Sequence, residues 1–181
     1  VAAGANFDAN GFSQTFAGLT GGGNVDLGTQ GITVAPTGTN NYSGQLSGSG
    51  GLTMSGSGTL TLNGANTYTG ATTVNNGTLK LNGGTNTLFV NAFGATQTLQ
   101  MNGGTLDLNG LTGVTGNVII NGTGAAALAA THNAALWNSS GTAASLTGVL
   151  TLGSTASVGG FGDLTLGVIN SAPGLTLAKV G

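Results

Sequence analysis

One six-residue pattern occurs three times in this chain and limits what the chain can fold into. Residues 59–64 read TLTLNG, residues 78–83 read TLKLNG and residues 105–110 read TLDLNG. Apolar and polar residues alternate within each copy, which is typical of a β-strand with one buried face. The Asn-Gly pair favours a turn because both residues tolerate a positive φ angle. Copies about 20 to 30 residues apart indicate a repeat architecture.

The same alternation extends over most of the 181 residues and predicts an all-β fold. Further Asn-Gly pairs begin at residues 10, 76, 102 and 121, where they separate candidate strands. The predicted strands are 24–27, 31–34, 52–54, 59–62, 72–74, 78–81, 87–90, 98–101, 105–108, 117–120, 145–152, 163–169 and 175–178.

Two architectures are compatible with these strands. Asn-Gly between alternating segments is the usual signal of a β-hairpin, which predicts an antiparallel sandwich or barrel. Longer-range self-similarity favours a coil of parallel strands instead. Residues 7–12 (FDANGF) return as residues 106–111 (LDLNGL), and residues 51–54 (GLTM) return as residues 174–177 (GLTL). We therefore predict a single-stranded parallel β-helix, a β-solenoid.

In such a coil each full turn, here called a rung, lies about 4.8 Å above the previous one. Equivalent side chains then stack, and the stacked leucines form the core. Asparagine amides can bond along the coil axis because they carry both a donor and an acceptor. The predicted core residues are Leu60, Leu62, Leu79, Leu81, Leu106 and Leu108, and the predicted turn and ladder residues are Asn63, Asn82, Asn109, Gly64, Gly83 and Gly110.

The predicted domain organisation is one β-solenoid domain over residues 1–181. With about 20 residues per rung, the chain makes about eight or nine rungs and a fibre of about 40 Å. The Ala-rich segment near 125–141 interrupts the alternation, and we expect an irregular rung or an insertion there.

The composition agrees with stacking and excludes several functions. Only 3% of residues are charged, with a net charge of -2. Stacked like charges destabilise neighbouring strands, which accounts for this low content. Nucleic-acid binding needs clustered Lys and Arg, so a nucleic-acid partner is not expected. The chain has no cysteine, and no apolar segment reaches the roughly 20 residues of a membrane span, so we expect no membrane insertion of this segment.

The segment 44–83 resembles the passenger-associated β-strand repeat of bacterial autotransporters. The residues that carry this resemblance are LTLNGANTYTG at 60–70, TTV at 72–74 and GTL at 77–79. A looser resemblance extends over 7–27 and 100–122, and 174–181 is similar to the opening of another copy. The resemblance implies a right-handed parallel β-helix exported to the cell surface. We therefore expect an extracellular or bacterial cell-surface location.

The sequence offers little for catalysis, metal binding or cofactors. Carbohydrate-cleaving enzymes on β-helices use paired carboxylates, but the four aspartates here lie far apart in sequence. Asp8 and Asp107 occupy equivalent repeat positions but are separated by several rungs. The segments around Asp26 and Asp163 resemble a calcium-binding repeat, yet each occurs once, and His132 has no second histidine or cysteine near it. We expect no enzyme activity, metal or cofactor.

The leading functional hypothesis is a structural extracellular β-solenoid that stacks end to end into a fibre or surface layer. A solenoid end exposes unpaired backbone groups, and neither end of this sequence has a recognisable cap. The expected partner is therefore another copy of the chain, bound head to tail. The end residues expected to take part are Phe7, Phe12, Leu175 and Leu177.

Two alternatives remain open. In the first, the chain is an adhesin or passenger segment whose lateral face binds glycan or a cell surface, and in the second it is an inert spacer. Trp137 is a possible lateral contact for an adhesin, although a lone aromatic residue more commonly packs against a rung or corner of the coil. A fibre requires regular assembly of the isolated chain, whereas adhesion requires retention on a defined ligand.

Overall fold

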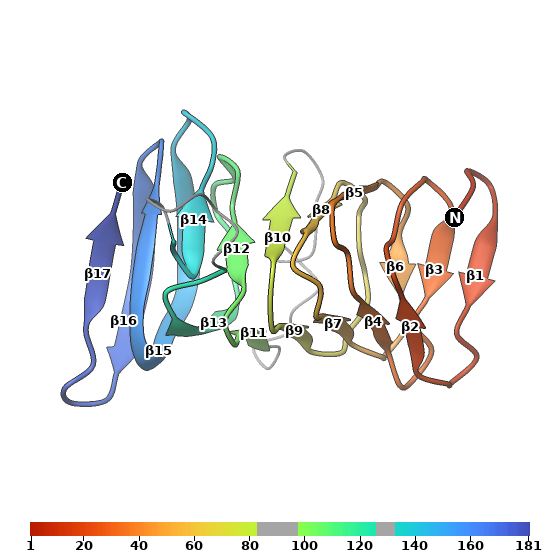
Figure 1. Ribbon diagram of the computed structural model, residues 1–181, viewed down its shortest axis with the longest axis horizontal. Coiled ribbons are helices and arrows are strands. Elements are labelled where there is room, and N and C mark those ends of the chain that lie inside the picture. Colours follow the sequence, from red (N-terminus) through yellow and green to blue (C-terminus); the bar gives the residue numbers. More distant parts are fainter. Residues whose placement is uncertain (83–97, 126–132) are drawn as a thin grey trace.

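The computed structural model describes residues 1–82, 98–125 and 133–181, which form a rod of stacked strands (Figure 1). The described residues contain strands and no helix. Every recorded strand pair is parallel, so neighbouring strands are joined through the coil and not by hairpins. The predicted β-solenoid is therefore confirmed, and the antiparallel alternative is wrong. The coil makes about eight rungs.

Two long columns of strands run along the rod, one on each side. The first contains β2 (Gln14–Phe16), β4 (Ile32–Val34), β7 (Leu52–Met54), β9 (Thr72–Val74), β11 (Thr98–Met101) and β13 (Asn117–Gly122). The second contains β5 (Thr39–Tyr42), β8 (Thr59–Leu62), β10 (Thr78–Leu81), β12 (Thr105–Asp107) and β14 (Leu136–Asn138). A third, short sheet near the N-terminus contains β1 (Asn6–Asp8), β3 (Asn24–Asp26) and β6 (Leu46–Ser47).

The two columns merge at the C-terminal end of the rod. Strand β15 (Ala144–Gly160) has 17 residues and pairs with β13 in its first half and with β14 in its second half. The last rung consists of β16 (Leu164–Ser171) and β17 (Leu177–Val180), which both pair with β15. One long curved strand therefore joins the two sides of the coil.

The core lies between the columns and is built from stacked aliphatic side chains. Leu60, Leu79 and Leu106 are in register on β8, β10 and β12, and each is 0% exposed. Leu62 and Leu81 form a second buried column beside them, and Leu108 follows β12 and is also buried. Each leucine in register therefore contacts the equivalent leucine of the adjacent rung. Burial of apolar surface contributes roughly 25 cal/mol per Å².

Part of the strand prediction differs from the structure. Residues 174–177 do not repeat the structure of 51–54, because the strand starts only at Leu177 and lies in the second column, whereas β7 lies in the first. The predicted strands 145–152 and 163–169 are parts of the longer β15 and of β16. Strands β1, β2, β5, β6 and β14 are not among the predicted ones.

Some predictions fall outside the described residues. These are the strand at 87–90, Gly83 and His132, and also the central part of the Ala-rich segment, residues 126–132. The described part of that segment contains β14, whose Leu136 is in register with Leu106. No helix that could cross a membrane occurs in the described ranges.

Candidate functional site: a polar groove on one side of the coil

Outward-facing side chains of the second column form two rows that run along the rod. Thr39, Thr59 and Thr78 are in register and form the first row. The second row lies two residues further along each strand and consists of Asn41, Thr61, Lys80 and Asp107. Since residues 60 and 62 point into the core, residues 59 and 61 must point outward. The repeat therefore places hydroxyl, amide and charged groups on one side.

These two rows line a groove of about 560 Å³. The described residues that line it are all polar: Thr39, Asn41, Thr59, Thr61, Thr78, Lys80, Asn82, Asp107, Asn109 and Ser139. The groove spans β5, β8, β10 and β12 and reaches the residue that follows β14. Its long direction follows the rows and therefore the coil axis.

An ion pair lies at one end of the groove. Lys80 Nζ is 3.5 Å from Asp107 Oδ2, and the two residues are paired in register on β10 and β12. The Asp107 side chain is only 5% exposed, and its Oδ1 accepts hydrogen bonds from the backbone N–H groups of Asn109 and Ser139, both at 2.9 Å. Lys80 Nζ also donates to Ser139 Oγ at 2.9 Å. The buried carboxylate is thus satisfied by one cation and two N–H donors.

A ladder of asparagine side chains borders the groove. Asn82 Nδ2 donates to Asn63 Oδ1 at 2.5 Å, and Asn109 Nδ2 donates to Asn82 Oδ1 at 3.2 Å. The ladder continues at one end through Asn63 Nδ2 to the carbonyl of Tyr42, and at the other through Ser139 Oγ to Asn109 Oδ1. The predicted ladder residues are thus linked through their side chains from rung to rung.

A second ladder follows the first column of strands. Asn102 Nδ2 donates to Asn75 Oδ1 at 3.2 Å, and Asn121 Nδ2 donates to Asn102 Oδ1 at 3.0 Å. Amide stacking at the ends of strands is therefore a property of the coil on both sides.

Two predicted turn positions have a left-handed backbone. Asn109 and its repeat counterpart Asn10 both have a φ of 48°, and each backbone N–H bonds the aspartate two residues earlier. Gly110 follows with a φ of 79°. At Gly64, which is buried, an added Cβ would lie 1.9 Å from the carbonyl oxygen of Gly44 on the adjacent rung. Only glycine permits this close approach of the backbone.

Similarity to known proteins agrees with this geometry. Residues 52–81 match the family model described as passenger-associated-transport-repeat. Over 162 residues, which are 88% of this chain, the sequence is 36% identical to the Adhesin BmaC autotransporter of Brucella suis biovar 1 (strain 1330). The chain belongs to the autotransporter passenger-repeat family. It spans only 5% of the length of that relative. No solved structure matches the chain significantly.

The matched repeat contributes the two central strands of the groove to this passenger-repeat chain. Residues 52–81 include β8 and β10, which carry Thr59, Thr61, Thr78 and Lys80. The flanking strands β5 and β12 lie outside the matched range, but outward-facing residues of both are in register with those of β8 and β10 and also line the groove.

The prediction that Trp137 is an exposed lateral contact is wrong. Trp137 is in register with Asp107 and Gly159 but is only 3% exposed. Its ring meets Phe161 edge-on, with centroids 5.5 Å apart. The neighbouring Gly159 leaves room for the indole, since an added Cβ there would lie 2.9 Å from it. Trp137 of the passenger-repeat chain therefore packs within the molecule and does not face a partner.

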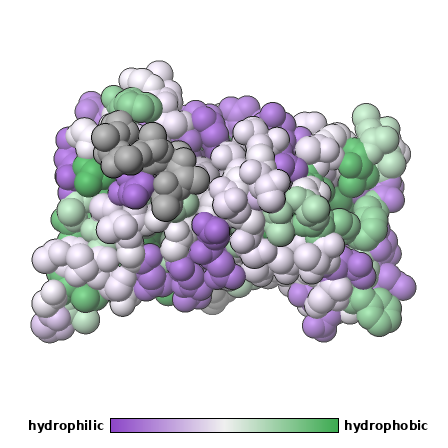
Figure 2. All heavy atoms as spheres, in the orientation of Figure 1, coloured by the Kyte–Doolittle hydropathy of each residue, from purple (hydrophilic) through white to green (hydrophobic). Residues whose placement is uncertain are grey.

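The predicted end residues lie at opposite ends of the rod. Phe7 is half-buried and packs edge-on against Phe16 at 5.3 Å, whereas Phe12 is 67% exposed. Leu175 and Leu177 are half-buried beside the last rung. Apolar surface gathers mainly toward the two ends in Figure 2.

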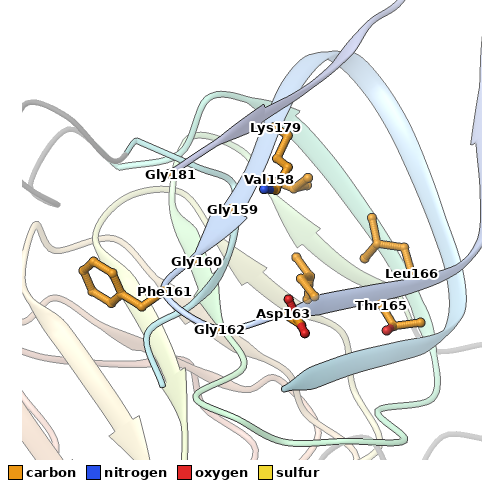
Figure 3. A pocket seen from close by; sticks show the side chains of 11 residues that line it. Val158, Gly159, Gly160, Phe161, Gly162, Asp163, Thr165, Leu166, Lys179 and Gly181 are labelled. Carbon is orange, nitrogen blue, oxygen red and sulfur yellow. The ribbon is translucent and has the colours of Figure 1, made fainter. Parts of the chain in front are cut away.

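The C-terminal end of the rod has an opening lined by both polar and apolar residues. This pocket of about 660 Å³ lies between β15, β16 and β17 and the turn at 161–163, with Asp163 and Lys179 at its sides (Figure 3). Lys179 is in register with Val158, which continues the core column of Leu106 and Leu136. The last rung thus places an ammonium group where earlier rungs have leucine.

Two of the aspartates that are far apart in sequence lie on adjacent rungs. Asp8 is in register with Asp26 on the adjacent rung, whereas its repeat counterpart Asp107 lies against Lys80. Asp8 and Asp26 each accept a hydrogen bond from the backbone N–H two residues later. In the described residues, no group of three or more His, Asp or Glu side chains could hold a metal ion.

Proposed function

We propose that this chain is a non-enzymatic segment of an exported adhesin passenger, which acts as a rigid rod on the outside of a bacterial cell. The observation that supports this proposal most directly is the continuous parallel ladder, together with the similarity to an autotransporter adhesin. Passenger homology itself implies a cell-surface or secreted location.

The physical basis for rigidity is the direction of the hydrogen bonds. In a parallel coil, backbone bonds and asparagine bonds both run along the rod axis, so bending or stretching the rod strains many of them at once. Each rung also buries its apolar face against its neighbours. A passenger built in this way holds a lateral surface at a fixed distance from the cell.

Adhesion is tested with beads that carry the purified chain. Polystyrene beads coated with the folded chain are expected to adhere to cultured host cells more than beads coated with the heat-unfolded chain. Equal adhesion of both bead types would contradict an adhesive role for the folded surface.

End-to-end assembly is a second proposal, supported by two apolar side chains that are exposed on β16. Val168 is 59% exposed and Ile169 is 46% exposed on β16, which among the described strands pairs only with β15. Electron microscopy of the purified chain is expected to show filaments that disappear in Ile169→Asp. A monomer at all concentrations would overturn this assembly.

A further inference from the structure

We propose that the polar groove between β5 and β12 is a binding site for an extended, uncharged polysaccharide that lies parallel to the rod. This inference rests on the proposed adhesin function and names the class of ligand. It is carried by the lining of the groove, by two buried hydroxyl groups without partners, and by the balance of charge.

The lining matches a ligand rich in hydroxyl groups. The groove presents threonine and serine hydroxyls and asparagine amides, and among the described residues no apolar side chain lines it. A peptide or lipid partner would bury large apolar side chains, and this part of the groove offers no apolar side chain to pack against them. The rows repeat at the rung spacing of about 4.8 Å. A polysaccharide also presents its hydroxyl groups at a regular interval along an extended chain.

Two threonine hydroxyls at the base of the groove need a partner. Thr61 is 7% exposed and Thr78 is 4% exposed, and neither side chain has a hydrogen-bond partner among the described residues. Buried polar groups nearly always form hydrogen bonds, so each exception calls for a ligand or a bound water. By contrast, Thr105 is the next residue in the row of Thr78, and its hydroxyl donates to the carbonyl of Ala134 at 2.7 Å. The two unpaired hydroxyls thus belong to residues that line the groove, whereas the paired Thr105 is not among the lining residues.

The charge in the groove favours an uncharged ligand. Lys80 and Asp107 neutralise each other, and they are the only charged residues among the described residues of the lining. The ammonium group has three donors, of which one is directed to Ser139 and one to Asp107. The remaining donor is available to a ligand hydroxyl.

The opposite side of the coil supplies a matched control. Thr33, Thr53 and Thr73 form an equally regular row on β4, β7 and β9. These positions have the same residue type and the same rung spacing, but they are not among the residues that line the groove. Substitution on this row changes the same chemistry away from the groove.

The test is affinity electrophoresis of the folded chain in gels that contain a soluble polysaccharide. The neutral probes are β-glucan, xylan and galactomannan, and the acidic probes are polygalacturonate and hyaluronan. We expect retardation by at least one neutral probe. In Thr61→Val/Thr78→Val the apparent affinity should fall by about tenfold or more, because each lost hydrogen bond contributes about 1 kcal/mol. The control Thr53→Val/Thr73→Val should behave as the wild type.

The folded state is checked separately by thermal unfolding. Replacing an unpaired buried hydroxyl by a methyl group of similar shape should leave the stability unchanged or raised, so a loss of binding is not a loss of folding. The inference is overturned if no neutral probe retards the wild type, if only acidic probes do, or if both double variants lose binding equally. In those cases bead adhesion still reports on the proposed function independently.

Discussion

The two tyrosines show how single side chains depend on this packing. Tyr42 and Tyr68 are buried in the core. The Tyr42 hydroxyl donates to the carbonyl of Gly23 at 2.6 Å, and the Tyr68 hydroxyl lies 2.5 Å from Thr72 Oγ1. Burial raises the pKa of Tyr42 from 10.0 to about 12 and raises the pKa of Tyr68 further. Burial disfavours the charged phenolate, so both side chains stay protonated in the folded coil.

These raised pKa values predict a loss of stability in alkali. Above pH 10 the unfolded chain releases its tyrosine protons while the folded chain retains them, so the unfolding free energy falls as pH rises. For a fully buried tyrosine the fall is about 1.4 kcal/mol per pH unit. Urea unfolding between pH 8 and pH 11.5 measures this slope. Tyr68→Phe should be less stable at pH 8 but should lose stability less steeply above pH 10, and equal slopes would contradict the assignment.

At the scale of elements, short strands are held together by side chains as well as by backbone bonds. Strands of three or four residues are too short to be stable alone. The asparagine ladder adds one amide bond per rung immediately after β8 and β10, where the chain turns out of the sheet. Neighbouring rungs are thereby fixed in register at the point where slippage would begin.

The ladder predicts a specific effect of Asn82→Asp. A carboxylate cannot donate to Asn63 Oδ1, so one bond is replaced by a contact between two acceptors. We expect the unfolding free energy at pH 7 to fall by about 1 kcal/mol. The matched control is Ser55→Asp, which adds the same charge at an exposed site whose side chain has no recorded hydrogen bond. Equal urea midpoints for the two variants would show that the ladder adds no stability.

The whole molecule is a rod whose two lysines lie in very different places. Lys80 is in the middle of β10, between β8 and β12, and its backbone belongs to the continuous ladder. Lys179 is exposed on β17, which in the described structure pairs only with β15. Local opening requires much less free energy at the end of the rod than in its middle.

Limited digestion with trypsin tests this difference, since the chain has no arginine. We expect cleavage after Lys179 first, with loss of the last two residues only. Cleavage after Lys80 should appear only near the melting temperature, because a protease needs a locally unfolded segment. Mass spectrometry of a time course identifies both products. A fragment that ends at Lys80, formed early at 25 °C, would contradict a continuous ladder.

Much of the fold follows from stacking identical segments. The copies at 59–62, 78–81 and 105–108 predict parallel register, and the structure pairs Leu60 with Leu79 and Leu79 with Leu106. The missed strands have weaker patterns. In β5 the sequence Thr-Asn-Asn-Tyr shows no apolar alternation, and its extended form is specified by pairing with β8. The groove was also missed, although Thr59, Thr61 and Thr78 belong to the repeat itself.

The sequence by itself determined that this chain forms a coil of parallel strands. Stacking buries the repeated leucines and pairs the repeated amides, and the low charge content permits it because few like charges face each other. The tertiary structure decided which outward side chains meet. Paired ladder residues lie 19 residues apart between one pair of rungs and 27 between the next, so the length of each connection sets the neighbours. Those lengths place Asp8 beside Asp26, bury Trp137 against Phe161, and leave Thr61 unpaired in a groove.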